Sequence, residues 1–329
     1  MNAINILITG ANGQLGHEMR NVLADDQRFN AIYTDVAGED ITMLDITDEA
    51  AVERIVTDNA INVIVNCVAY TAVDAAEDNE PLAERLNAQA VGILAHVAKR
   101  HNARMVHVST DYVFDGQGCI PYTEDMPTNP QSAYGRTKLE GEHLLLDVLC
   151  DDAIILRTAW LYSPYGKNFV KTMLMLGKDK PALKVVFDQV GSPTCAQDLA
   201  KAIITVITAD EWHPGIYHYS NEGVISWYDF TKAIHRLTGI TTCDVQPCHS
   251  DEFPAKAHRP AYSVLDKTKF KTTFGVTVPY WLDSLEETLE ALGESNRTKN
   301  LKLTTKNSKY NVPDNRNHPP PHLCHHLPP

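Results

Sequence analysis

The sequence predicts an α/β fold, in which a doubly wound parallel sheet is joined to a smaller C-terminal domain. Short apolar segments alternate with helical patterns through about residue 160 of the 329 residues. The first apolar segment leads directly into a glycine-rich turn. A much later helical pattern begins with Tyr134 and Lys138, which are spaced to share one helix face. A chain of this length can bury a large core and form one and a half to two domains.

The glycine-rich turn follows a short β-branched strand that is predicted over residues 4–9. Gly10, Gly13 and Gly16 come next, and a helical pattern starts within the turn. Gly10 permits a tight turn, Gly13 lets backbone N–H groups approach a pyrophosphate, and Gly16 lets the helix pack close to the strand. The helix N-terminus adds a partial positive charge where phosphates would lie. These features predict a Rossmann-type dinucleotide-binding turn.

A carboxylate ends the second predicted strand, which covers residues 31–35. Asp35 stands where an acidic side chain accepts hydrogen bonds from the adenosine ribose and repels a 2′-phosphate. This favours NADH over NADPH, unless an Arg or Lys from elsewhere in the chain reverses the preference. Asp45 lies near the start of the next helical pattern, where it either contacts the adenine amine or caps the helix. The sequence leaves both roles open.

The third predicted strand covers residues 62–67 and leads into Ala69, Tyr70 and Thr71. Its carboxyl end must lie at the sheet edge where ligands bind in such folds. The small side chain of Ala69 and the hydroxyl of Thr71 suit close contact with the ribose and phosphates of the nicotinamide half. An ordinary turn between a strand and a helix is the alternative interpretation.

Hydroxyl side chains follow the fourth predicted strand, residues 104–108, at Ser109 and Thr110. Tyr134 and Lys138 begin a helix on one of its faces. A free tyrosine has a pKa near 10, about three units above neutral pH. A nearby ammonium group and the positive ring of an oxidised nicotinamide would both lower that pKa. The sequence therefore predicts Tyr134 as a proton donor, Lys138 as its pKa partner and ribose ligand, and Thr110 as a hydrogen-bond donor to the substrate oxygen.

These motifs resemble the extended short-chain dehydrogenase/reductase superfamily and, within it, the dTDP-4-dehydrorhamnose reductase family. The resemblance extends over residues 1 to about 293 and rests on segments 9–16, 65–77, 109–116, 134–138, 157–162 and 191–200. In that family the reduced cofactor gives a hydride to C4 of a keto sugar nucleotide, and a tyrosine protonates the oxygen. The resemblance implies NADPH- or NADH-dependent reduction of dTDP-4-dehydro-6-deoxy-L-mannose to dTDP-L-rhamnose, a precursor of cell-surface polysaccharide.

The resemblance also implies roles for individual residues. Tyr134 is the general acid, Lys138 its pKa partner and Thr110 the hydroxyl that tunes proton transfer. Thr110, Asp111 and Trp160 would touch the sugar. The residues implied to line the cofactor site, beside Gly10, Gly16, Tyr134 and Lys138, are Gly13, Gln14, Leu15, Asp35, Asp45, Ile46, Ala69, Tyr70, Thr71 and Val108.

A metal is not predicted. Some members of the family use Mg²⁺ at a dimer interface, held by a glutamate that would match Glu18 here. A single glutamate on a helix is more often a solvated side chain. Cys243 and Cys248 lie close together in the sequence, but no histidine spacing supports zinc.

The C-terminal half contains two candidate ligands for a substrate diphosphate, Lys256 and Arg259. Arginine suits bidentate phosphate contacts, and exposed surface cations are the alternative interpretation. Trp160 either stacks on the sugar or base or packs in the core. Trp227 and Trp281 are assigned to packing.

Composition narrows the class of protein. The net charge of −13 argues against nucleic acid and anionic membranes as partners. The partner expected for this chain is therefore the sugar-nucleotide substrate. No run of eighteen apolar residues and no signal peptide are evident, so a cytoplasmic protein is expected. The seven cysteines include no C-x-x-C pair, which is typical of reduced thiols. The sequence does not distinguish a monomer from a homodimer.

The predicted domains are a dinucleotide-binding domain over residues 1–162 and a mainly substrate-binding domain over 163–293. Segments near 196–220 are expected to return to the first domain. The tail over 296–329 carries six Lys or Arg, one Asp and many Pro, His and Asn residues, and is predicted to be disordered. Its histidines and Cys324 would bind a metal adventitiously, and we interpret the tail as an extension without function.

Two other functions stay open beside the reductase. A related sugar-nucleotide epimerase or dehydratase is one, but Tyr112 follows Asp111 where a dehydratase usually has Glu. The second is a non-catalytic regulatory subunit that binds NADP, like the β subunit of methionine adenosyltransferase. The intact set of Thr110, Tyr134 and Lys138 disfavours that interpretation.

Overall fold

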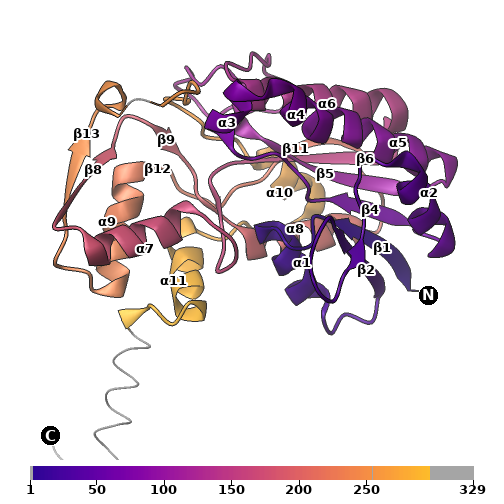
Figure 1. Cartoon of the computed structure of the whole chain (residues 1–329), viewed down its shortest axis with the longest axis horizontal. Helices are drawn as coiled ribbons and strands as arrows, with labels where there is room; N and C mark the ends of the chain where they lie inside the picture. The colour runs from indigo at the N-terminus through magenta and orange to yellow at the C-terminus, as the bar shows by residue number, and fades with distance from the viewer. Residues whose placement is uncertain (1–2, 254, 297–329) are drawn as a thin grey trace, which may run out of the picture.

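The computed structural model describes residues 3–253 and 255–296, and the predicted tail beyond Asn296 lies outside this range. Its centre is a seven-stranded parallel sheet in the order β11-β6-β5-β4-β1-β2-β3 (Figure 1). The strands are β1 (Ile4–Thr9), β2 (Phe29–Asp35), β3 (Thr42–Met43), β4 (Val63–Asn66), β5 (Arg104–Thr110), β6 (Ala153–Thr158) and β11 (Gly215–His218). The strand order reverses between β1 and β4, where ligands of such sheets bind.

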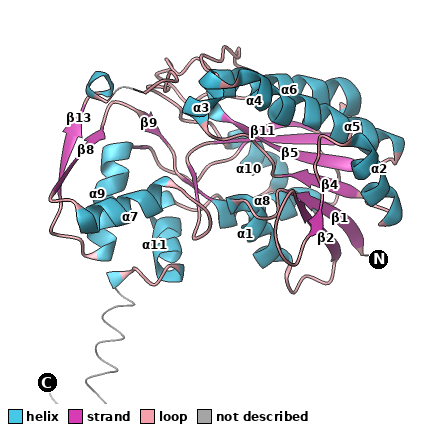
Figure 2. Cartoon of the chain, viewed as in Figure 1, coloured by secondary structure: helices cyan, strands magenta, loops and turns pink. Residues whose placement is uncertain are grey.

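Helices cover both faces of this sheet, which confirms the predicted fold class (Figure 2). Met19 and Leu199 pack on Ile6 on one face, while Leu94 packs with Leu7 on the other. Neighbouring residues of β1 point to opposite faces, so a strand covered on both sides is apolar at every position. The helices are α1 (Gln14–Leu23), α8 (Ala196–Ile207) and α10 (Thr268–Phe274) on the first face, and α2 (Glu49–Asp58), α5 (Ala90–Arg100) and α6 (Ala133–Leu149) on the second.

Short helices follow β4 and lead to α5. They are α3 (Val73–Asp78), α4 (Glu80–Glu84) and a π-helical turn over Arg85–Gln89. Asn79 caps α4, because its side chain accepts the N–H of Leu82 at 3.3 Å. A 3₁₀ turn over Asp111–Val113 follows β5 directly.

A smaller part of the molecule has its own apolar core. It contains α7 (Phe169–Asp179), α9 (Trp227–Thr238) and α11 (Trp281–Ala291), and Phe230 lies at its centre. Its strands form three short pairs: β7 (Leu161–Tyr162) with β10 (Thr194–Cys195), β9 (Val190–Gly191) with β12 (Ile225–Ser226), and β8 (Ala182–Val186) with β13 (Asp244–Cys248). Trp281 is buried in this core, as expected for a packing residue.

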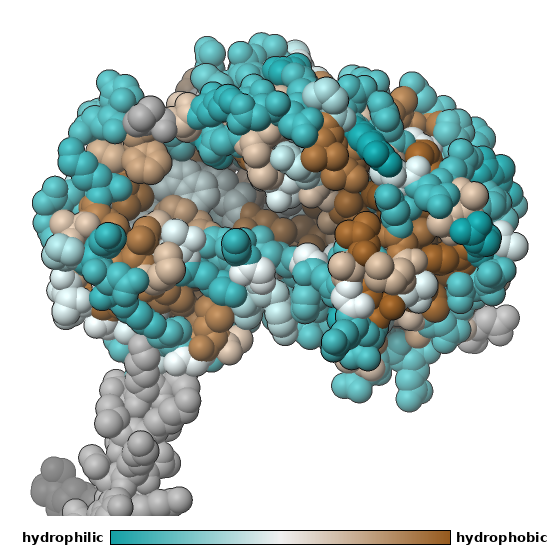
Figure 3. Space-filling model, in the orientation of Figure 1, coloured by the Kyte–Doolittle hydropathy of each residue, from teal (hydrophilic) through white to brown (hydrophobic). Residues whose placement is uncertain are grey.

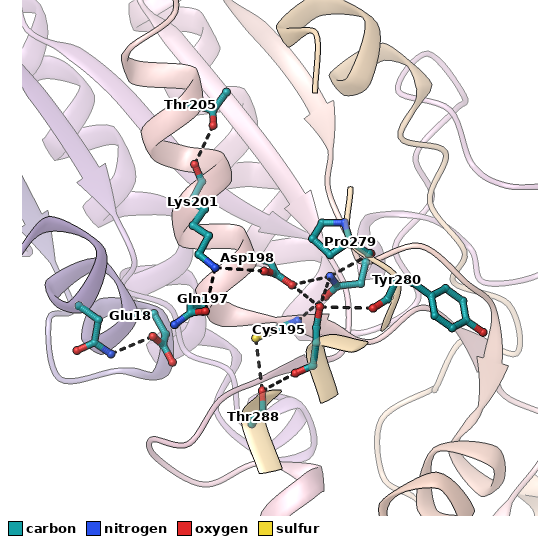
Figure 4. A network of polar contacts seen from close by, with 12 residues as sticks. Glu18, Cys195, Gln197, Asp198, Lys201, Thr205, Pro279, Tyr280 and Thr288 are labelled. Carbon is teal, nitrogen blue, oxygen red and sulfur yellow. Dashed lines mark hydrogen bonds and ion pairs between the residues drawn. The ribbon is translucent and has the colours of Figure 1, made fainter. Parts of the chain in front are cut away.

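A buried hydrogen-bond network joins the two parts (Figure 4). Asp198 on α8 accepts bonds from Asn221 at 2.7 Å and from Ser284 on α11 at 2.6 Å. Asn221 in turn accepts the N–H of Cys195 at 2.7 Å, and the Cys195 thiol lies 3.5 Å from the Thr288 hydroxyl. Because these groups are shielded from water, breaking one bond would leave a buried polar atom without a partner. The network therefore fixes how α8 and α11 sit relative to each other.

The space-filling view shows a hollow between the part with the large sheet and the part with α7, α9 and α11 (Figure 3). Within the described residues, no helix has the length and apolar character needed to cross a membrane.

Candidate active site at the carboxyl edge of the sheet

The glycine-rich turn has the backbone geometry that close approach of a phosphate requires. Gly10 has φ +70°, in the left-handed region that favours glycine. A Cβ on Gly16 would overlap the carbonyl oxygen of Gly10 and the backbone of Ala11. Gly13 precedes α1 with no side chain capping the helix, so the first N–H groups of α1 keep no side-chain acceptor. This cradle fits a pyrophosphate, and a side chain at Gly16 would push α1 away from β1.

A carboxylate and a guanidinium both contact Asn12 in the glycine-rich turn. Asp35 accepts the backbone N–H of Asn12 at 3.0 Å and that of Val36 at 2.7 Å. Arg20 on α1 donates to the side-chain oxygen of Asn12 at 3.2 Å, and its guanidinium lies 5.6 Å from the ring centre of Tyr33. Arg20 is therefore a cation that contacts the same asparagine as Asp35, and the sequence alone did not identify it.

Asp45 does not cap α2, so the N-cap alternative is wrong. Its carboxylate accepts the backbone N–H and the hydroxyl of Thr47 at 2.9 and 2.8 Å, which lowers the pKa of Asp45. Asp48 caps the helix by accepting the N–H of Ala51 at 3.1 Å. The predicted adenine contact of Asp45 stays a prediction.

Several predicted cofactor residues have side-chain or backbone groups that already contact other parts of the chain. Leu15 and Ile46 are buried in the cores on opposite faces of the sheet, so only their backbones are available to a ligand. The Gln14 side chain accepts a bond from Asn168 at 2.9 Å, which places the segment after β7 against the glycine-rich turn. Tyr70 donates its backbone N–H to Asn87 at 2.8 Å.

The proposed proton donor lies beside its predicted partner hydroxyl. Tyr134 stands in the first turn of α6, which Ser132 caps by accepting the N–H of Gly135 at 3.1 Å. The Thr110 hydroxyl, at the end of β5, is close enough to the Tyr134 side chain to act on its pKa. Burial raises the pKa of Tyr134 well above its usual value, and the Thr110 hydroxyl opposes this only in part. In the chain without bound cofactor or substrate, the Tyr134 phenol is therefore protonated at neutral pH.

The contacts of the Lys138 amino group are with groups other than Tyr134. Its amino group donates to the carbonyl oxygen of Val108 at 2.7 Å and lies 3.2 Å from Nε2 of His107. Burial lowers the pKa of Lys138 to about 8, and the Glu142 carboxylate acts in the opposite direction. The effect of burial on Tyr134 outweighs any lowering of its pKa by this ammonium.

Asp111 is a buried carboxylate next to Thr110. The Thr110 hydroxyl donates to it at 2.9 Å and accepts the N–H of Tyr112 at 3.2 Å. Burial raises the pKa of Asp111 to about 6, while hydrogen bonds from Thr110 and Ser263 act against this. A carboxyl group in this position can accept a hydroxyl of a sugar.

Trp160 packs in the core, which is one of the two roles that the sequence left open, and its contact with a sugar stays a prediction. Its ring stacks on Trp227, with centroids 3.5 Å apart and planes at 9°, so Trp227 packs as predicted. The backbone of Trp160 has φ +49°, which is rare for a residue with a side chain. Trp160 as a whole residue is half-buried, next to β7.

The two candidate diphosphate ligands are ion-paired to α3. Arg259 donates to Asp74 at 2.5 Å and to the Tyr112 hydroxyl at 3.2 Å, while Lys256 pairs with Asp78. The backbone N–H of Ala257 also bonds to Asp74, at 3.0 Å. The loop that carries both cations is thus held against the helix that follows β4.

Glu18 is buried rather than solvated, contrary to our expectation. It accepts a bond from Asn21 at 3.0 Å, and burial raises its pKa (Figure 4). Across residues 3–253 and 255–296, no group of three or more His, Cys, Asp or Glu side chains is arranged to hold a metal.

The sequence did not identify His107 and Asn66 as site residues. His107 contacts Lys138, and Asn66 contacts His107. Both are fully buried polar residues that directly follow buried apolar residues of their strands. That exception to the pattern was the signal that could have identified them, because a buried polar group needs a partner.

Comparison with known proteins agrees with this geometry. The family model described as RmlD substrate binding domain matches residues 4–294. The chain is 41% identical over 298 residues to the dTDP-4-dehydrorhamnose reductase of Aggregatibacter actinomycetemcomitans, covering 85% of this chain and 97% of the relative.

Two crystal structures share the fold over nearly their full length. A dTDP-4-dehydrorhamnose reductase from Clostridium acetobutylicum has a TM-score of 0.82 at 46% identity, covering 88% of this chain and 99% of that one. The enzyme of the same name from Bacillus anthracis, in complex with NADP, has a TM-score of 0.82 at 35% identity, with the same coverage.

Proposed function

The chain belongs to the RmlD substrate-binding domain family, and from that premise we propose that it reduces dTDP-4-dehydro-6-deoxy-L-mannose to dTDP-L-rhamnose with NADH or NADPH. The observation that carries the proposal is the meeting of Thr110 and Tyr134 at the carboxyl edge of the sheet that also carries the glycine-rich turn. This is where a ligand of a doubly wound sheet binds.

The proposed chemistry divides between the cofactor and the chain. When bound, the reduced nicotinamide supplies a hydride to C4 of the keto sugar. Tyr134 would hold the ketone oxygen by a hydrogen bond and give it a proton, and Thr110 would donate to the same oxygen after exchanging Asp111 for it. The raised pKa of Tyr134 keeps that proton in place until the oxygen becomes strongly basic. Lys138 binds the nicotinamide ribose and favours the phenolate that remains.

The cofactor is proposed to lie across the carboxyl ends of β1, β2, β4 and β5. Its pyrophosphate meets the turn at Gly10, Gly13 and Gly16, whose cradle a Cβ would fill. Asp35 binds the adenosine ribose, and we propose that it makes NADH the preferred cofactor. Arg20 is the group that would limit this preference, because it lies in the same corner and attracts a 2′-phosphate.

The substrate is proposed to occupy the hollow between the two parts of the molecule (Figure 3). Residues 1–162 would bind the cofactor and 163–293 mainly the sugar nucleotide. Asp111 and Trp160 would contact the sugar. Arg259 and Lys256 bind the diphosphate after exchanging Asp74 and Asp78 for the phosphate oxygens.

The test is oxidation of NADH or NADPH, followed by its absorbance, with dTDP-4-dehydro-6-deoxy-L-mannose as the substrate. Stoichiometric formation of dTDP-L-rhamnose is the expected result. Conversion of a sugar nucleotide without net cofactor oxidation would instead identify an epimerase. Tight cofactor binding with no oxidation by any keto sugar would identify a regulatory subunit.

A further inference from the structure

Four buried side chains form a chain of contacts from β1 to Lys138. Thr9 Oγ1 donates to Asn66 Oδ1 at 2.7 Å, Asn66 Nδ2 lies 3.1 Å from His107 Nδ1, and His107 Nε2 lies 3.2 Å from Lys138 Nζ. None of the four is more than 1% exposed. Water does not reach these groups, so each donor needs an acceptor within the chain. The proposed reaction uses Lys138 but gives the other three no role.

The backbone decides which way the Asn66 amide points. The N–H of Val68 donates to Asn66 Oδ1 at 3.1 Å, and a backbone N–H cannot act as an acceptor. The same oxygen accepts the Thr9 hydroxyl. The amide nitrogen therefore faces His107, where it can only donate. His107 Nδ1 must accept, so the neutral ring carries its hydrogen on Nε2.

That hydrogen points at the amino group of Lys138. Burial, reinforced by Lys138, holds the pKa of His107 well below its usual value, so the ring is neutral. An amine accepts the Nε2–H with its lone pair, whereas an ammonium group has no lone pair. Each of the two N···N contacts of His107, with Asn66 and with Lys138, has room for one hydrogen atom. If Lys138 is an amine, each contact contains one hydrogen. If Lys138 is an ammonium group, the two contacts together contain three hydrogens, so two of them face each other. The contacts thus oppose the charged form of Lys138.

The other groups around Lys138 do not remove this conflict. The Val108 carbonyl accepts a hydrogen bond from Lys138 in either state. Glu142 on α6 favours the ammonium form, but its carboxylate already binds Arg157 on β6 at 2.6 Å and the Ser109 hydroxyl at 2.5 Å. Tyr134 precedes Lys138 by one turn of the same helix, and its phenol is neutral.

We propose that Asn66 and His107 are positioning residues, which set the charge of Lys138 through the tautomer of the imidazole. They thereby set the pH range over which the proton reaches the ketone oxygen. The tautomer follows from the contacts alone, whereas the effect on the reaction rests on the proposed function. Two measurements separate these parts.

The first measurement is the His107 tautomer, read from long-range ¹H–¹⁵N correlations in the ¹⁵N-labelled full-length chain. At about pH 9.5, above the Lys138 pKa of about 8, hydrogen on Nε2 is expected. The signals are assigned by their loss in His107→Gln. In Asn66→Asp, the nearly isosteric carboxylate accepts from Nδ1, so the hydrogen should move to that nitrogen. Hydrogen on Nδ1 in the unaltered chain would overturn the proposal.

The second measurement is kcat/KM against pH, which reports groups of the free enzyme. Activity should fall above about pH 8 as Lys138 loses its proton. In Asn66→Asp and His107→Gln, the fall should move to higher pH by about one unit or more. His96→Gln, an exposed histidine on α5, should leave the profile unchanged.

If the fall of kcat/KM at high pH occurs at the same pH in Asn66→Asp as in the unaltered chain, the proposed role of Asn66 and His107 in the reaction is wrong. This holds even if His107→Gln does not fold. Absence of cofactor oxidation at every pH would instead count against the proposed function. The tautomer measurement still decides the hydrogen-bonding part in that case.

Discussion

Asp35 at the end of β2 accepts the backbone N–H of Asn12 in the glycine-rich turn, at a distance of 3.0 Å. This bond couples the carboxylate proposed to bind the adenosine ribose to the loop proposed to bind the pyrophosphate. Arg20 approaches the same loop through the side chain of Asn12. The choice between NADH and NADPH is therefore proposed to depend on the balance of one negative and one positive side chain.

Replacing Asp35 with Asn should shift the preference towards NADPH. The amide keeps the size of the side chain and an oxygen for the Asn12 N–H, but removes the charge that repels a 2′-phosphate. The ratio of kcat/KM for NADH to that for NADPH should fall by about ten-fold or more. Asp26→Asn removes the same charge from a carboxylate that Arg28 pairs at 2.6 Å, and should leave the ratio unchanged. An unaltered ratio in Asp35→Asn would exclude this carboxylate as the determinant.

Replacing Asp111 with Asn should stabilise the folded chain at neutral pH while reducing its activity. The folded pKa of Asp111 is raised from 3.8 to about 6, so its contribution to stability is present at low pH and is lost as pH rises through 6. The shift corresponds to on the order of 3 kcal/mol above that pH. Urea unfolding at about pH 4 and pH 7.5 should show a gain for the variant at the higher pH only.

Asp115→Asn is the matched control for that experiment, since it alters another carboxylate of the same segment. Backbone and side-chain hydrogen bonds from Gln117 and Tyr122 lower the pKa of Asp115, so its stabilising contribution is present at neutral pH and lost on acidification. The control should lose stability at pH 7.5. Two variants that respond alike would contradict the assignment of burial as the cause at Asp111.

Replacing Arg259 with Ala should raise KM for the sugar nucleotide by about ten-fold or more and leave kcat nearly unchanged. The variant loses a charge-assisted hydrogen bond between Arg259 and a phosphate of the substrate. This bond is expected to be equally strong in the ground state and the transition state, so its loss weakens binding without slowing the chemical step. Arg100→Ala removes an exposed arginine of α5 that pairs with Glu49 and Glu53, and serves as the control. Asp74→Asn frees Arg259 from its partner and should lower KM. An unchanged KM in Arg259→Ala would assign this arginine to holding the loop alone.

The central strands were predictable because their signals are local. Residues 4–9 and 153–158 form strands with the predicted bounds. The strands predicted over 31–35, 62–67 and 104–108 correspond to β2, β4 and β5, and differ from them by only one or two residues at an end. Strands covered by helices on both faces read as unbroken apolar runs, which need no knowledge of distant residues. The glycine-rich turn is similarly determined by its own sequence.

The contacts that complete the candidate site were not predictable, because their partners are distant in the sequence. Arg259 meets Asp74 across 185 residues, and His107 meets Lys138 across 31. Asp45 failed as a cap because Asp48, three residues later, matches the true start of α2. Glu18 looked like a surface residue because the packing of α8 over α1 cannot be read from α1 alone.

The central claim is that Tyr134 protonates the ketone oxygen, and Tyr134→Phe tests it most directly. The variant keeps the ring and its packing beside Tyr112, where the ring centroids are 5.5 Å apart, but removes the hydroxyl. Cofactor affinity should be retained, and single-turnover oxidation of NADH with dTDP-4-dehydro-6-deoxy-L-mannose should slow by roughly 100- to 10,000-fold. Oxidation at the rate of the unaltered chain, with cofactor bound equally well, would contradict the account.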